Sequence, residues 1–580
     1  MKKEKIRLKN NLLLLIPITV FLSIIYVLPL FTNGGLIAGD DMMFHSTRLK
    51  MLAEEISTGN LYPMIYRKMF CGYGYAAGLF YPSLFLYPFA VLNNMGLSII
   101  YCIELYFITV NVLTGISFFC CSRAIFKDMK YKNYNFYGFI IFVLSLLDPY
   151  KFYNYHGRAS FGEFTAMIFA PIVVLGVYYI FKHNKKSYIL ALGMTGLITC
   201  HVLSFVIACM VLMIVYVYNI KRIIKCHKIL TQTLFAGLQC ALLSMFIWFP
   251  MIEMLFKTDL LVSHTAALYV GPIFRHCLLK FADNDALGII LILVFVIYSI
   301  IKKDIYNRLI QLSLFYCFFN SDLFPWRLLS ITKHISSIQF PWRLSSIFYF
   351  ATAYYLYLVI KDICKIIKEH HNLKHNVNTN ASAPINNLDT VINNVLKGLA
   401  ITTYILFMFL YIWAFLIRPQ DEFSSRKFVT EQECNEISTS ALLEYVPYDL
   451  AINNREKSLP NLNVIKINNI EYTADELNPG KKVSFVKNFI KSGYEIEYET
   501  EDNEICVPII NYTGYETDVE NTEISTTKYG FMKISNIPNN GTIKITYKGT
   551  LFQKLAWIGP NIYVMGIIIF LIAQKKKTRP

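Results

Sequence analysis

The chain is built from long apolar runs that alternate with short polar segments. The first run, NLLLLIPITVFLSIIYVLPLF, covers residues 11–31, and similar runs recur along most of the sequence. Helices of roughly 15–25 apolar residues match the thickness of a bilayer. The pattern therefore predicts a polytopic α-helical membrane protein with about twelve transmembrane helices.

Basic residues in the short connections predict the orientation. The first run follows MKKEKIRLKN, and later connections include KDMKYKN, KHNKK and KRIIKCHK. Because short cytoplasmic loops are enriched in Lys and Arg, we expect both termini in the cytoplasm and a long first external loop at 32–96. Within this loop, 79–92 is apolar but contains Pro82 and Pro88, which predicts a re-entrant or interfacial segment.

The remaining crossings follow from the same pattern. We expect helices at 97–126, 136–148, 164–181, 187–200, 202–219, 229–249, 286–301, 309–319, 345–360 and 398–417, with mixed loops at 250–285 and 320–344. Residues 361–397 are rich in Lys, His and Asn, which predicts a cytoplasmic linker. These segments together form a predicted transmembrane domain at 1–417.

The region 418–552 has a different pattern. Stretches such as GYEIEYET (493–500) and GTIKITYKG (541–549) alternate apolar and polar residues, and turn signals such as PNNG separate them. Alternation with a period of two predicts an extracytoplasmic β-rich domain. The chain then ends, at 553–580, in a final predicted transmembrane helix and a basic cytoplasmic tail.

Composition agrees with a membrane location. Hydrophobic residues make up 55% of the chain and charged residues only 16%, whereas soluble domains contain about 25% charged residues. The net charge of +16 is scattered over short loops, so it fits a positive-inside bias and not a nucleic-acid surface. No Cys/His cluster has zinc spacing, so no zinc site is predicted. We expect no cofactor, and the use of a divalent metal is left open. A disulfide between Cys434 and Cys506 is left open.

Polar residues collect in the segments predicted to face outward. In GDDMMFHSTRLKMLAEEIS, the residues Asp41, His45 and Arg48 share one side of a helix predicted at about 41 to 57. Leu49, Leu52 and Ile56 lie on another side and should pack on the bundle. Asp40 or Asp41 could also cap the N-terminus of this helix. For Asp40 the two interpretations are equally good, whereas for Asp41 the shared side with His45 and Arg48 favours a functional role.

Later segments add further candidate site residues. The loop 148–163 contributes Asp148, His156, Arg158 and Glu163, and His201 ends a predicted span. The motif FPWRL occurs twice and contributes Trp326, Arg327, Trp342 and Arg343. An arginine fork suits bidentate phosphate binding, but Trp and Arg also anchor helices at lipid headgroups. Glu104 lies inside a predicted span without an obvious partner.

Three stretches carry a resemblance to a known family. GDDMMFHSTRLKMLAEEISTGNLYP, HGRASFGEFTAMIFAP and SSIQFPWRLSSI resemble the bacterial membrane proteins called 6-pyruvoyl-tetrahydropterin synthase-related. These proteins look like GT-C glycosyltransferases, which use polyprenyl-phosphate sugars. The resemblance implies a catalytic acid in the first external loop, at Asp41 with Asp40 beside it. It implies a second functional acid at Asp148 or Glu163.

The sequence thus predicts a membrane glycosyltransferase that acts on the outer face. Its partners would be a polyprenyl-phosphate-linked sugar donor, a cell-envelope glycan or lipid acceptor, and membrane lipids. Arg327 and Arg343 would bind the donor phosphate, and Asp41 would act as base with its carboxylate held by His45 or Arg48. Two alternatives stay open: a transporter or flippase for lipid-linked glycans, and a non-catalytic protein that binds envelope glycan.

Overall fold

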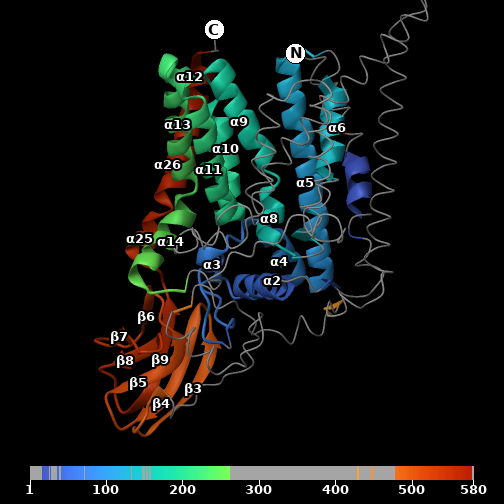
Figure 1. The fold of residues 1–580 in the computed structure, drawn as a ribbon. Coiled ribbons are helices and arrows are strands. Elements are labelled where there is room, and N and C mark those ends of the chain that lie inside the picture. Colours follow the sequence, from blue (N-terminus) through green and yellow to red (C-terminus); the bar gives the residue numbers. More distant parts are fainter. Residues whose placement is uncertain are drawn as a thin grey trace, which may run out of the picture.

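The fold is that of a computed structural model of the chain. The structure describes residues 16–24, 27, 36–37, 41–70, 72–131, 134–146, 151, 154–155, 158–261, 428–429, 446–447 and 477–577. Figure 1 shows long helices running side by side, with two β-sheets beyond one end of them. The expected linker at 361–397 and the four spans expected between 286 and 417 lie outside the described residues.

The polar segment after the first apolar run forms the predicted helix. Helix α2 spans Met42–Ser57 and lies across the ends of the long helices instead of parallel to them (Figure 1). Leu49 and Leu52 are buried in the core, and Ile56 packs against it. These apolar contacts hold α2 on the bundle.

The segment 79–92 does not cross the molecule. It contains part of α3 (Ala77–Phe80), the 3-10 helix η1 (Leu84–Leu86) and most of α4 (Tyr87–Asn94). Pro88 lies in the first turn of α4, where its missing N–H costs no hydrogen bond. Helices this short agree with the expected re-entrant or interfacial segment.

The apolar runs that follow form helices close to their expected positions. They are α5 (Ile99–Asp128), α6 (Tyr134–Leu146), α8 (Phe161–Ala166), α9 (Ala170–His183), α10 (Ser187–Cys200), α11 (Val202–Tyr218), α12 (Ile220–Lys225) and α13 (His227–Leu243). Near the C-terminus, α25 (Leu551–Leu555) and α26 (Ile558–Lys577) follow the β-sheets. The helical class of the apolar region is therefore confirmed.

The described residues support fewer crossings than the predicted number of about twelve. Two helical segments are long and apolar enough to span a membrane: α5 (Ile99–Asp128) and the segment Phe161–His183, which contains α8 and α9. The number is three if one bent pair of helices counts as a single span. The helices α10 and α11 are apolar but shorter, with 14 and 17 residues, and are not among these segments. Within the described residues, the apolar runs therefore predicted more crossings than there are helices of sufficient length.

The bent pair also corrects the predicted loop at 250–285. After α13 ends at Leu243, α14 (Met245–Lys257) continues at 75° to it, where the sequence predicted a straight crossing followed by a loop. Pro250 is accommodated inside α14. The bend brings α14 to α25, where the Thr550 hydroxyl donates to Glu253 Oε2 at 2.6 Å.

The predicted β region contains two antiparallel sheets. One has the order β3-β4-β9-β6 and the other β5-β8-β7. Their strands are β3 (Val483–Ile490), β4 (Gly493–Thr500), β5 (Glu504–Ile510), β6 (Tyr515–Thr517), β7 (Glu523–Thr526), β8 (Phe531–Ser535) and β9 (Asn540–Tyr547). The stretch GYEIEYET is β4, and its Tyr494, Ile496 and Tyr498 are buried as the alternation predicts. A further short pair joins β1 (Leu36–Ile37) to β2 (Phe428–Val429).

The sheets share one core with the loop between α2 and α3. Tyr66, Phe70 and Tyr75 of this loop belong to the same buried cluster as Tyr494 and Tyr512. Backbone contacts reinforce the packing: the Ile510 N–H donates to the Tyr73 carbonyl at 2.8 Å, and the Tyr494 hydroxyl donates to the Arg67 carbonyl at 3.1 Å. The sheets are thus packed firmly on the end of the helical part.

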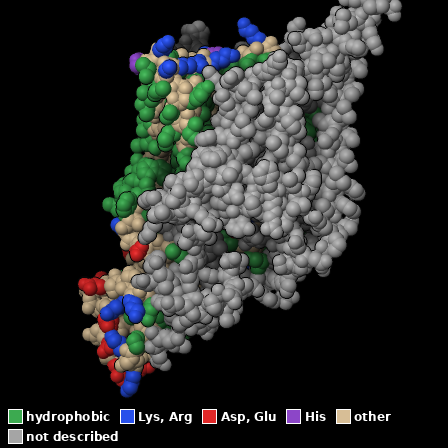
Figure 2. Space-filling model, in the orientation of Figure 1, with side chains coloured by type: hydrophobic (Ala, Val, Ile, Leu, Met, Phe, Trp, Pro, Cys, Tyr) green, Lys and Arg blue, Asp and Glu red, His purple; other side chains and the backbone are tan. Residues whose placement is uncertain are grey.

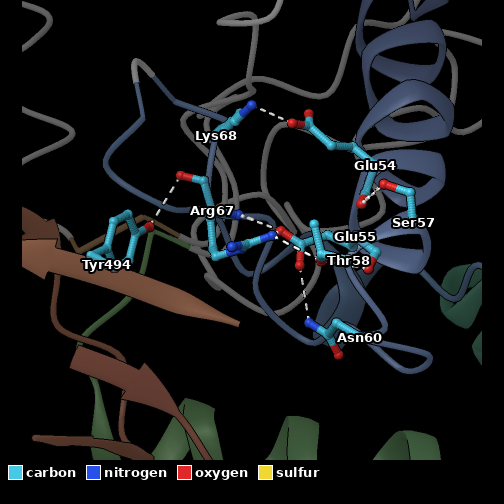
Figure 3. Close-up of polar contacts among 8 residues, drawn as sticks. All are labelled: Glu54, Glu55, Ser57, Thr58, Asn60, Arg67, Lys68 and Tyr494. Atoms are coloured by element: carbon cyan, nitrogen blue, oxygen red, sulfur yellow. Dashed lines mark hydrogen bonds and ion pairs between the residues drawn. The ribbon is translucent and has the colours of Figure 1, made fainter. Parts of the chain in front are cut away.

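A buried ion pair anchors this loop to α2 (Figure 3). Arg67 Nε donates to Glu55 Oε1 at 2.8 Å, and the two side chains are 7% and 4% exposed. Asn60 donates to Glu55 Oε2 at 3.0 Å, and the Arg67 N–H donates to Oε1 at 3.2 Å. Three donors on one carboxylate compensate for its loss of water.

Basic side chains gather at the end of the helices opposite the sheets. In Figure 2, Lys and Arg line this end, an apolar surface covers the helices, and the sheets carry mixed charges. The basic residues belong to the α9–α10 connection and to α12 and its neighbours: Lys182, Lys185, Lys186, Lys221, Arg222, Lys225 and Lys228. Basic residues and β-sheets thus lie at opposite ends of the helices, and the side of a membrane that each end faces stays a prediction from the basic loops.

That separation predicts a labelling pattern. On a cysteine-free background, Lys482→Cys in the sheets should react with a membrane-impermeant maleimide added to intact cells, because Lys482 is 84% exposed. Lys228→Cys should react only after the cells are permeabilised. Labelling of Lys228→Cys in intact cells would contradict the orientation.

The buried ion pair predicts a large loss of stability when it is broken. Arg67→Ala leaves the Glu55 carboxylate buried without its cation, which costs about 3–5 kcal/mol of unfolding free energy. The control is Lys68→Ala, because Lys68 pairs with Glu54 at the surface, where the two side chains are 42% and 33% exposed. This substitution should lower the free energy of unfolding by less than about 1 kcal/mol. Denaturant unfolding of the full chain in detergent measures the loss of stability in each variant. Equal losses in the two variants would show that burial does not strengthen the pair of Arg67 and Glu55.

Candidate functional site

The candidate site lies at the start of α2, where this helix meets the segment that leads into α8. The Asp41 N–H donates to the Arg158 carbonyl at 2.8 Å, so backbone contact joins the two segments. Five of the predicted site residues come from these segments: Asp41, His45, Arg48, Arg158 and Glu163. A sixth, His201, lies beside them at the start of α11. The structure therefore gathers residues that are far apart in the sequence.

Arg158 connects two acidic residues of the site. Its Nη1 lies 3.1 Å from Glu163 Oε2 and its Nη2 lies 3.5 Å from Asp41 Oδ2. The Arg158 and Glu163 side chains are 6% and 4% exposed, but that of Asp41 is 28% exposed. Asp41 is thus the carboxylate that a reactant can reach, and the buried guanidinium lies against it.

This arrangement differs from the sequence prediction in one contact. The carboxylate of Asp41 was expected to be held by His45 or Arg48, which follow it at helical spacing. Among the described residues, the cation in contact with it is Arg158, whose position depends on how α8 docks against α2. Helical spacing placed the three residues on one side but could not reveal a partner from another segment.

His45 is buried and should be neutral at pH 7. Its ring stacks on Phe161 with centroids 4.6 Å apart, and its Nδ1 has no hydrogen-bond partner among the described residues. Burial lowers the pKa of His45 well below 6.5, and the nearby charges of Arg48, His201 and Arg158 lower it further. A neutral imidazole at this position can accept or donate one hydrogen bond.

Arg48 adds a second buried cation to the site. Burial lowers the pKa of its guanidinium from 12.5, while tyrosines including Tyr66 and Tyr106 favour the charged form. The guanidinium lies 5.8 Å from the centre of the Tyr81 ring, a cation–π distance. Its Nε has no hydrogen-bond partner among the described residues, so the group is able to donate to an anionic ligand.

The segment from Arg158 to Glu163 is held by close contacts. Ala159 has a left-handed backbone with φ of 57°, which is costly for a residue with a Cβ. Gly162 allows α8 to approach His201, because a Cβ there would lie 2.9 Å from His201 Cδ2. His201 Nδ1 in turn accepts from the Ser204 N–H at 3.2 Å. Together these contacts fix where the Arg158 side chain lies.

Sequence reasoning missed Tyr106, which supports the site from α5. Its hydroxyl donates to the Phe161 carbonyl at 3.0 Å and also contacts Thr165, and its ring stacks on Phe161 at 4.8 Å. Phe161 is thereby held between Tyr106 and His45. A tyrosine inside an apolar run gives no signal of this role, because aromatic residues are common there.

A second buried polar group lies on α5. Glu104 and Asn111 are spaced seven residues apart, so they share one face of the helix, and both are about 2% or less exposed. Lys151 contacts Asn111, whose amide also donates to Ser23 at 3.0 Å. Sequence reasoning noted Glu104 but missed Lys151, although it stands in the polar stretch DPYKFYNYHG.

Seven predicted site residues lie outside the described residues. They are Asp40, Asp148, His156, Trp326, Arg327, Trp342 and Arg343. Within the parts of the chain that the structure describes, no group of three or more His, Cys, Asp or Glu residues is placed to hold a metal ion.

Comparison with known proteins identifies no relative. No protein-family model matches this sequence, and no curated protein matches it. The site must therefore be interpreted from its own geometry.

The buried His45 predicts a loss of stability in acid. Its pKa in the folded state lies below the value of about 6.5 in the unfolded state. The unfolded state therefore binds more protons as pH falls below about 6.5, and stability decreases by up to about 1.4 kcal/mol per pH unit until the folded pKa is reached. His45→Asn should flatten this part of the curve of unfolding free energy against pH.

The matched control is His227→Asn, because His227 is exposed at the start of α13. This variant should keep the wild-type curve between pH 7.5 and 4.5. An unchanged curve for His45→Asn would contradict the assignment of a buried neutral imidazole.

Proposed function

We propose that this protein is a membrane glycosyltransferase of the GT-C type. It would transfer a sugar from a polyprenyl-phosphate donor to an acceptor of the cell envelope. The observation that carries the proposal is the Asp41 carboxylate, reachable from outside and held by the buried Arg158 at the end of the helices that faces the β-sheets. Its place in the first external segment is the one that the family resemblance implies for a catalytic acid.

Asp41 is proposed to act as the general base. It would accept the proton of the acceptor hydroxyl while the acceptor oxygen forms a bond to the anomeric carbon of the sugar. The bond from that carbon to the phosphate oxygen breaks, and its electron pair leaves with the phosphate. Arg158 and Glu163 would be positioning residues, since the guanidinium holds the Asp41 carboxylate and the buried Glu163 keeps the guanidinium in place.

Cations near the site would bind the leaving phosphate. Arg48 is a buried guanidinium with a donor available, and it lies on the same helix as the proposed base. Arg327 and Arg343 of the repeated FPWRL motif are proposed to form the main clamp, with Trp326 and Trp342 beside them. Guanidinium groups in a site shielded from water stabilise a phosphate that gains negative charge in the transition state, so the scheme needs no metal.

The proposed orientation places this chemistry on the outer face of the membrane. The end of the helices that is rich in Lys and Arg would face the cytoplasm, and the β-sheets would face outward. The sheets pack directly on the loop that follows α2, so they are suited to guide an acceptor toward the site. A lipid-linked donor would reach the same end from within the bilayer.

One observation favours transport of a lipid-linked glycan as a second candidate. The long apolar helix α5 carries the buried polar residues Glu104 and Asn111, and the buried Lys151 contacts Asn111. Polar groups at such depth are costly and often mark a transport pathway. Glu104→Gln should reduce lipid translocation in reconstituted vesicles if the second candidate is correct, and should leave glycosyl transfer intact if the first one is.

The proposed function predicts the effect of Asp41→Asn. The glycans and lipids that change in cells lacking the protein would identify donor and acceptor, and transfer would then be measured in membranes. Because general-base catalysis contributes about 10²–10⁴-fold, Asp41→Asn should reduce turnover by about that factor while the protein still folds. Asp40→Asn should reduce transfer less, because Asp40 is the neighbour of the proposed base and the N-cap position of α2 is occupied by Asp41.

The matched control is Glu54→Gln, an acid on the same helix that is paired with Lys68 outside the site. It should keep full transfer. If folded Asp41→Asn also keeps full transfer, the base is Asp40, Asp148 or Glu163, or the protein is not an enzyme of this type.

A further inference from the structure

A cavity of about 250 Å³ lies where the loop after α2, the β-sheets and α25 meet. Its lining includes Asn60, Arg67, Lys548, Gln553, Lys554 and Trp557. Asn60 and Arg67 both bind Glu55, near the C-terminal end of α2 (Figure 3). At 1.5 Å per residue, Glu55 is about 21 Å along the helix from Asp41. The cavity is therefore separate from the candidate site described above.

One wall of the cavity holds a buried donor without a partner. Gln553 is 1% exposed, and its Oε1 accepts from the Tyr547 hydroxyl at 2.9 Å and from the Thr550 N–H at 3.4 Å. These two bonds fix the orientation of the amide, and its Nε2 has no partner among the described residues. A buried N–H₂ group of this kind needs an acceptor to offset its loss of water.

The same cavity has an excess of positive charge. Lys548 and Lys554 are both exposed at its edge, and both lie near one acid, Glu516, so two lysines share a single carboxylate. Lys548 lies 2.9 Å from Glu516, but both side chains are more than half exposed, so this pair is weak. Arg67 is neutralised by Glu55, and the next acid, Glu253, pairs with Lys257 at 2.7 Å. The lining therefore favours an anion.

The cavity borders the apolar surface of the helices. Leu551, Trp557 and Ile558 are 73%, 40% and 47% exposed, and α26 continues from there with further exposed apolar side chains. Figure 2 shows this apolar surface directly beyond the sheets. Tryptophan favours the boundary between lipid tails and headgroups, and lysine at that depth attracts acidic lipids.

We infer that the cavity binds the phosphate of an acidic membrane lipid. Lys548 and Lys554 contact the phosphate oxygens, Gln553 Nε2 donates to an oxygen of the headgroup, and the acyl chains lie along α26. A soluble phosphate offers the same acceptor oxygens but lacks the chains. This lipid site does not depend on whether the protein transfers a sugar with Asp41 as its base. The two proposals can therefore fail separately.

The test uses the full chain in a neutral detergent, with binding followed by native mass spectrometry. The probe is a short-chain phosphatidylglycerol, which should bind the wild type. The double variant Lys548→Ala and Lys554→Ala should bind it about twenty-fivefold more weakly, from roughly fivefold for each lysine near a lipid surface. Both lysines are exposed, so the variant should fold normally.

Matched measurements separate the possible outcomes. Lys482→Ala removes an exposed lysine of the same sheets far from α25, and it should bind the probe like wild type. Phosphatidylcholine of equal chain length should bind more weakly, because its choline cation faces the two lysines. Equal binding by the double variant and the wild type would overturn the inference. Displacement of the lipid by equimolar inorganic phosphate would support a phosphate site but overturn the lipid as its occupant.

Discussion

Helix α2 is held by a buried guanidinium at each end, and the arrangement of the site and the sheets depends on this. Arg158 contacts Asp41 at the first end, and Arg67 contacts Glu55 at the second. A buried charge is tolerated only when an opposite charge and hydrogen bonds compensate for lost water. Each arginine therefore restricts where the segments that contribute its partners can lie. Because α2 lies across the bundle, these contacts join its two ends to different parts of the molecule (Figure 1).

The two ends of α2 serve different parts of the protein. The first end meets α8 and the stacked rings of Phe161 and His45, which form the candidate site. The second end meets the loop whose carbonyl at Arg67 accepts from Tyr494 of the sheets. A shift of the sheets would therefore act on the same rigid helix that carries Asp41. This connection joins the sheets, the proposed place of acceptor binding, to Asp41, the proposed base.

Burial determines the chemical states available to the site. Burial lowers the pKa of both His45 and Arg48, because it disfavours their charged forms. Neighbouring cations lower the pKa of His45 further. A neutral imidazole beside a guanidinium and a carboxylate provides donors and acceptors within one small region. The lipid cavity at α25 is the opposite case, since its lysines are exposed and attract an anion from outside.

The sequence by itself determined the local structure wherever one periodicity dominated. The alternation in GYEIEYET predicted β4, because its buried face is formed within a single strand, and the polar helix after residue 40 was predicted almost to the residue. The helical class of the apolar runs followed from length and composition. The predicted number of about twelve spans did not follow from length and composition. The described residues support two or three spans, and the bend at Ser244 has no local signal in the sequence. The sequence also identified Asp41, His45, Arg48, Arg158 and Glu163 as candidates, because charged residues next to apolar runs are conspicuous. Only the tertiary structure decided that Arg158 and not His45 lies against Asp41, that Arg67 binds Glu55, and that Gln553 faces a cavity. These contacts join segments from different parts of the chain, so no local spacing encodes them.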